Sequence, residues 1–190
     1  MVTFNYLSNN VIGALELLRS NHENLMLGGV ISSVIEFLGR CLESPTNKDS
    51  PKNFYRFIDD FLAMQNPLYG RYKELLYKDL RCGSAHTIMA KGGVTLSYDP
   101  KAVSLHLSIK RRLQDNTYQL WIYSPYLIED MKGAIVNFIQ RAGVTPELKE
   151  RYIETIKQLQ KEGQENIKKF IPKEDLLNAE VISARGDIII

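Results

Sequence analysis

The chain has 190 residues, of which 44% are hydrophobic and 24% are charged, and its formal net charge is +2. These are ordinary globular values for a chain long enough to bury a core, and they permit contact with nucleic acid without demanding it. No window reaches the roughly 18 uncharged apolar residues that a membrane span needs, and the first residues show no basic stretch before an apolar one. We therefore expect neither secretion nor a membrane span, and a cytoplasmic location.

Apolar residues at helical spacing predict three helices in the first third of the chain. These helices cover residues 7–19, 25–42 and 53–64. Gly28, Gly29 and Gly39 each cost the second helix about 1 kcal/mol against alanine, which makes sense if another helix crosses it closely. Residues 43–51 are dense in turn formers and predict an exposed loop. A fourth helix is expected over residues 72–88.

After Gly93 the hydrophobic period changes from helical to alternating. The alternating stretches are residues 94–98, 105–110 and 118–123. They predict a three-stranded antiparallel meander that is inserted at residues 92–124, packs one face on helices, and begins close to the end of the fourth helix. On its second strand, we expect His106 to face outward beside Ser108 and Lys110.

Helical spacing returns near Leu127 and predicts a helix that ends at Ala142-Gly143. Thr145-Pro-Glu fits the start of a last helix through Phe170, and we interpret its mixed charges as a solvated face rather than an RNA track. The apolar stretches 181–183 and 187–190 predict a short terminal strand pair or a covered edge strand. The whole chain is thus expected to form one domain, residues 1–190, of the α+β class with mainly α structure.

Cofactor and metal chemistry find little support in the sequence. The two cysteines form no CxxC pair, and three scattered histidines without a carboxylate cluster do not make a metal site. Gly92-Gly93 lacks the lysine and hydroxyl residue of a phosphate-binding loop. We expect free thiols, no metal and no cofactor.

Residues 72–86 combine helical patterning with reactive side chains, of which Arg81 and His86 are the most telling. An imidazole exchanges a proton near neutral pH, and a guanidinium holds a phosphate through two parallel hydrogen bonds. Such a pair suits cleavage of a phosphodiester by a neighbouring 2′-hydroxyl without a metal. On an ideal α-helix the two residues stand about 140° apart, so either they are unrelated or they meet through long side chains, a helix end, or a second copy of the helix across a dimer axis.

The run Leu75-Leu-Tyr-Lys-Asp-Leu-Arg-Cys-Gly-Ser-Ala-His86 resembles the signature of the HEPN superfamily (higher eukaryotes and prokaryotes nucleotide-binding domains), an arginine and a histidine four residues apart near a helix end. It is similar to a large set of uncharacterised bacterial HEPN-like proteins. The resemblance implies a small helical bundle that dimerises, and a metal-independent RNase of a defence or stress system. It also implies that His86 acts as general base or acid and that Arg81 holds the scissile phosphate. Cys82 and Ile88 stand where the family often has Asn and Tyr.

Structural roles for the same residues stay open. Arg81 would also fit a surface ion pair with Glu36, Glu74 or Asp79, and His86 would fit a helix C-terminus. Glu36, Asp79 and Ser84 are therefore supporting site residues, the last because small residues permit close helix approach.

Two functions follow: a metal-independent endoribonuclease, or a non-catalytic module for RNA binding, nucleotide binding or dimerisation. Both lead us to expect a homodimer, with RNA and an unidentified protein partner or antitoxin as further partners, and no membrane. Arginine–histidine pairs that face one open, positive groove would favour the enzyme, whereas burial and pairing with carboxylates would oppose it.

Overall fold

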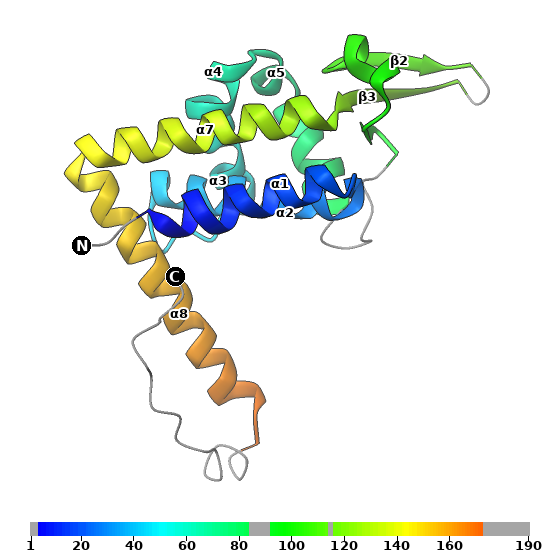
Figure 1. Ribbon diagram of the computed structural model, residues 1–190. Helices are drawn as coiled ribbons and strands as arrows, with labels where there is room; N and C mark the ends of the chain where they lie inside the picture. The colour runs from blue at the N-terminus through cyan, green and yellow to red at the C-terminus, as the bar shows by residue number, and fades with distance from the viewer. Residues whose placement is uncertain (1–3, 84–91, 114–115, 173–190) are drawn as a thin grey trace.

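A computed structural model describes residues 4–83, 92–113 and 116–172 (Figure 1). As predicted, the fold is α+β and mainly α. Its helical segments are η1 (Tyr6–Val11), α1 (Ile12–Ser20), α2 (Asn24–Glu43), α3 (Ser50–Phe57), η2 (Ile58–Leu62), α4 (Ala63–Gln65), α5 (Leu68–Leu75), η3 (Leu76–Arg81), η4 (Pro100–Leu105), α7 (Ser124–Val144) and α8 (Pro146–Phe170). The strands are β1 (Val94–Ser97), β2 (Ser108–Arg112) and β3 (Thr117–Tyr123). The segments η1, η2 and η3 are π-helical and η4 is a 3₁₀ helix.

The helix α2 lies in the middle of the bundle, where α1, α3, α8 and η3 all contact it. Its apolar positions recur every three or four residues, so one broad stripe that includes Leu27, Ile31 and Leu38 is fully buried. The helix is also long and apolar enough to cross a membrane, but 61% of its most apolar window is buried inside the fold. A core helix passes that test as readily as a membrane span does.

The predicted close helix crossing occurs at Gly39. A Cβ atom at this position would lie 1.8 Å from the backbone oxygen of Asn53 on α3, so only glycine fits. At Gly29, by contrast, nothing lies within 4 Å of such an atom, and the prediction is wrong there. The Asn53 side chain also accepts a hydrogen bond from Nδ2 of Asn47 and donates one to the backbone oxygen of Asn47, which ties the loop before α3 to the crossing.

The predicted antiparallel meander is wrong in its pairing. The strand order is β1-β3-β2, with β1 parallel to β3 and β2 antiparallel to it. The reason is η4, which lies between β1 and β2 in the chain and lets β2 pair on the far side of β3. Asp99 accepts a hydrogen bond from the backbone of Lys101, and Pro100 occupies the first turn, so a segment expected to be a simple turn forms a helix instead.

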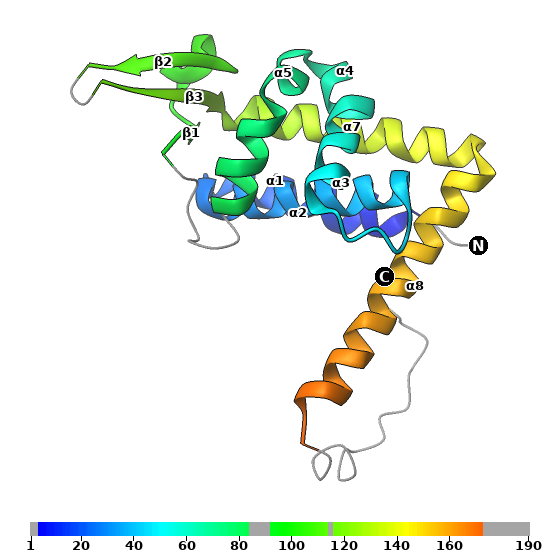
Figure 2. The same cartoon turned by 180° about the vertical axis from the view of Figure 1, so that it is seen from behind.

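The sheet is anchored to the bundle at its β1 end. The backbone N–H of Gly93 donates to Oδ2 of Asp79 on η3 (3.0 Å), and the N–H of Leu120 donates to the oxygen of Gly93 (2.8 Å). The side chains of Val94, Leu120 and Ile122 join the main core. Away from this anchor, the β2–β3 hairpin extends beyond the helices (Figures 1 and 2).

The two predicted C-terminal helices are confirmed as α7 and α8. Thr145 starts α8 through its backbone oxygen, which accepts from Leu148 and Lys149, rather than through its side chain. The far half of α8 leads away from the bundle (Figure 2). The expected strands at 181–183 and 187–190 lie outside the described residues.

Candidate functional site

Arg81 is the last residue of η3 and pairs with Glu36 on α2. Its Nε donates to Oε2 of Glu36 over 2.8 Å, and the two side chains are 25% and 26% exposed. The hydrogen bond to Glu36 raises the pKa of Arg81 further, so the guanidinium is charged at neutral pH. The guanidinium carbon also lies 5.9 Å from the centre of the Tyr77 ring. The result is a charged, oriented and partly accessible cation.

The supporting residues separate into different roles. Glu36 is the carboxylate that pairs with Arg81, whereas Asp79 accepts the backbone N–H of Gly93 and holds the start of the sheet. His86 and Ser84 lie outside the described residues, and their relation to Arg81 stays a prediction. The angle of about 140° that an ideal α-helix would place between Arg81 and His86 likewise stays a prediction.

A cavity of about 380 Å³ reaches Glu36, the carboxylate that pairs with Arg81. Its polar lining includes Glu36, Arg40, Asn47, Lys48 and Asn53. The Arg40 guanidinium donates to Glu162, and this bond lowers the pKa of that carboxyl. Phe37 and Leu159 also line the cavity, which therefore mixes charged, amide and apolar side chains.

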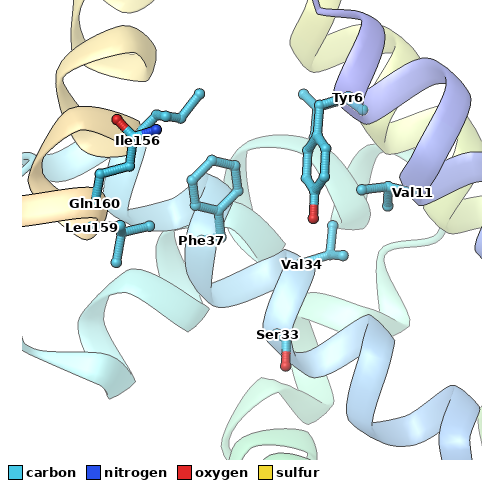
Figure 3. A pocket seen from close by; sticks show the side chains of 9 residues that line it. Tyr6, Val11, Ser33, Val34, Phe37, Ile156, Leu159 and Gln160 are labelled. Atoms are coloured by element: carbon cyan, nitrogen blue, oxygen red, sulfur yellow. The ribbon is translucent and has the colours of Figure 1, made fainter. Parts of the chain in front are cut away.

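A second cavity, of about 290 Å³, lies between η1, α2 and α8 (Figure 3). Tyr6 and Val34 face it from one side, and Phe37, Ile156 and Leu159 face it from the other. Among the residues that the structure describes, no charged side chain lines it. Such a cavity offers nothing to hold a phosphate or move a proton, so it is not the site of the chemistry expected at Arg81.

His106 occupies a site that the sequence analysis missed. The expectation that it faces outward on a strand is wrong: it ends η4, and its side chain is only 9% exposed. The backbone N–H of Tyr123 donates to its Nδ1 (3.2 Å), which places the hydrogen of the neutral ring on Nε2. Oδ2 of Asp130 lies 3.6 Å from Nε2, and the Tyr69 hydroxyl lies 3.4 Å from it.

The fully buried Tyr69 completes this cluster by donating its hydroxyl to Oδ2 of Asp130 (2.8 Å). Burial raises the pKa of Tyr69 well above its ordinary value, so its hydroxyl remains a donor. The cluster joins α5, η4 and α7 through groups that are already engaged with one another. We interpret it as a structural junction that fixes the base of the sheet.

Removal of the acceptor in this junction should be costly. We expect Asp130→Ala to lower the free energy of unfolding by about 2 kcal/mol, because it leaves the buried Tyr69 hydroxyl without that partner. Tyr69→Phe should lower the free energy of unfolding by about 1 kcal/mol, because water can replace the lost hydroxyl as a donor to the Asp130 carboxylate. Urea unfolding of both variants and of the double variant measures these values.

Glu129→Ala, the control beside Asp130, loses only exposed ion pairs and should lower the free energy of unfolding by less than about 1 kcal/mol. Strict additivity in the double variant would contradict the junction.

Comparisons of the chain with protein-family models, with curated proteins and with solved structures found no match. Within residues 4–83, 92–113 and 116–172, no three His, Cys, Asp or Glu side chains gather as metal ligands do. The function is therefore argued from the Arg81 site and its surroundings.

Proposed function

We propose that this chain is a metal-independent endoribonuclease of the HEPN type that acts in defence or stress response. The observation that carries the proposal is the partial exposure of Arg81: its charged side chain is 25% exposed at the end of η3. Its pairing with Glu36 is the kind of carboxylate contact that we expected to oppose an enzyme, and the remaining exposure is what leaves the guanidinium accessible to a phosphate. Glu36 accepts from Nε of Arg81, so the two Nη groups of Arg81 suit two parallel hydrogen bonds to a phosphate. In this role Glu36 is a positioning residue.

In the proposed reaction, the 2′-oxygen of a ribose attacks the adjacent phosphorus and the bond to the 5′-oxygen breaks. One imidazole takes the proton of the 2′-hydroxyl, and an acid returns a proton to the departing 5′-oxygen. Arg81 neutralises the charge that develops on the phosphoryl oxygens. Two copies of the helix in a homodimer would supply both imidazoles, since each chain contributes one His86. The products are a 2′,3′-cyclic phosphate and a 5′-hydroxyl.

The test is cleavage of a labelled mixed-sequence RNA in excess EDTA. We expect the parent protein to cut and to leave 2′,3′-cyclic phosphate ends. His86→Ala should lower the rate by about 100-fold or more, the range for loss of a general acid or base, and Arg81→Ala should abolish cutting similarly.

Two control variants match these changes. Arg71→Ala removes an exposed arginine of α5, and His22→Ala removes an imidazole from the turn after α1. Both should cut RNA like the parent, provided that circular dichroism shows equal folding. Equal rates for the parent, His86→Ala and Arg81→Ala would contradict the proposal.

The second candidate is a non-catalytic module for RNA or nucleotide binding or for dimerisation. It is favoured by the same ion pair, because a partly buried arginine that bonds a carboxylate on another helix also serves to join the two helices. RNA that binds but is not cut by the parent, together with unchanged binding in His86→Ala, would favour this module over the nuclease.

A further inference from the structure

The β2–β3 hairpin carries three consecutive cations and an exposed tyrosine. Lys110, Arg111 and Arg112 end β2, and Tyr118 lies near the start of β3 with 63% of its surface exposed. All four side chains are exposed, and the hairpin extends beyond the helices (Figure 1). We call these four residues the basic arm.

Charge is concentrated in this part of the chain. Residues 92–124 contain four lysines and arginines but only two acidic residues. This short segment therefore has as much net positive charge as the whole protein, whose other charges balance. One of its two acids, Asp99, already accepts the backbone N–H of Lys101. A surface of this kind attracts a polyanion.

The strand register places a cation beside the aromatic ring. Arg111 is directly opposite Tyr118, so both lie on the same face of the sheet, and Lys110 is opposite Gln119 on the other face. Arg111 is further fixed by its Nε, which donates to Oδ1 of Asn116 near the turn (2.5 Å). Phosphate binding beside an aromatic platform is the arrangement by which proteins hold single-stranded nucleic acid.

The basic arm is also connected to the Arg81 site by two hydrogen bonds. Asp79, two residues before Arg81, holds Gly93, and Gly93 in turn accepts from Leu120. Leu120 is opposite Ile109, the residue before Lys110, and it is two strand residues, about 7 Å, from Tyr118. A strand of nucleotides that lies on the arm would thus continue toward Arg81.

We infer that the basic arm binds single-stranded RNA, with Arg111 on one phosphate and Tyr118 stacked on a base of the same face, and with Lys110 on a second phosphate where the RNA passes round the edge strand β2. The inference rests on the proposed function, because the RNA bound by the basic arm would be the substrate that is cleaved at the Arg81 site. An anionic membrane surface would also attract the cations. It is disfavoured because the register places Arg111 beside Tyr118, an arrangement that holds a phosphate next to a stacked base, whereas a membrane surface would use the cations alone.

The test measures binding by fluorescence anisotropy with a labelled mixed-sequence single-stranded RNA. All proteins carry His86→Ala so that no RNA is cut. We expect Lys110→Ala with Arg111→Ala to weaken binding about tenfold and to reduce the slope of log affinity against log salt by about 1.4, which corresponds to two phosphate contacts. Tyr118→Ala should weaken binding about tenfold as well, with little change in slope. Lys157→Ala with Lys161→Ala, which removes the same charge from exposed positions of α8, should leave both values near the parent's.

The outcomes separate this inference from the proposed nuclease. Loss of RNA affinity in the arm variants supports the arm even if the parent does not cut RNA. If the parent cuts, the arm variants should raise KM and keep kcat, because they bind substrate away from the reacting atoms. Affinities and salt slopes that are equal in the arm and α8 variants would overturn the inference. So would arm-dependent binding to phosphatidylcholine–phosphatidylserine vesicles with unchanged RNA affinity.

Discussion

The substitution Gly39→Ala should lower the free energy of unfolding by about 3 kcal/mol. The added Cβ would lie 1.8 Å from the backbone oxygen of Asn53 and 2.5 Å from its carbonyl carbon, so α2 and α3 must separate by more than 1 Å. That separation would loosen Phe54 and Phe57, which are fully buried on α3. Overpacking of this kind costs about 1–3 kcal/mol or more and outweighs the gain of about 1 kcal/mol in helix propensity.

Gly29→Ala provides the matched control in the same helix. Because nothing lies within 4 Å of its added Cβ, this change should stabilise the protein by up to about 1 kcal/mol. Thermal unfolding should separate the two variants clearly, since 1 kcal/mol corresponds to about 2–4 °C for a chain of this size. If Gly39→Ala proved as stable as Gly29→Ala, α2 and α3 could not cross as closely as described.

Above pH 9, stability should depend on the buried thiol of Cys41. Burial raises the pKa of this thiol from 9.0 to about 12. The unfolded chain therefore releases the proton near pH 9 while the folded protein keeps it until about pH 12. Within that window the unfolded state binds fewer protons, and so the free energy of unfolding falls as pH rises. At 1.36 kcal/mol per pKa unit, the complete loss is about 4 kcal/mol.

Urea unfolding at about pH 8 and about pH 11 measures the effect. The parent should lose about 3 kcal/mol more between these values than Cys41→Ala, which has no thiol to titrate there. The comparison uses the pH dependence alone, because the missing sulfur also changes packing. Cys82→Ala, in which the partly exposed cysteine is removed, should keep the steep dependence of the parent. An equally steep fall in Cys41→Ala would contradict the assignment.

The helices were predictable because their signals are local. The apolar stripe of α2 and the Thr145-Pro start of α8 specify each helix without reference to the rest of the chain. Strand pairing is different: alternation in β1 indicates a buried face but does not specify the neighbour, and the parallel pairing with β3 depends on how η4 crosses. Asp99-Pro100 was a usable signal for η4, since this pair often starts a helix as well as a turn.

The ion-pair partner of Arg81 could not be predicted from local spacing. Local spacing offered Glu74 and Asp79 to Arg81 as readily as Glu36, and the packing of η3 on α2 selects the one that is distant in sequence. Asp79 is instead engaged by Gly93. No pattern in the sequence unites Tyr69, His106 and Asp130, because they come from three elements that only the fold brings together.

The π-helical segment η3 has a consequence for how this site is inherited. A π turn holds one residue more than an α turn, so every side chain beyond Leu76 is rotated relative to the preceding α5. Loss of one residue between Leu76 and Leu80, with a return to the α period, would remove that extra residue and leave Arg81 facing Glu36. Loss of one residue from the regular helix α5 would instead turn Arg81 by about 100°, away from Glu36. The π turn is therefore the place where this helix can shorten by one residue and still keep the ion pair.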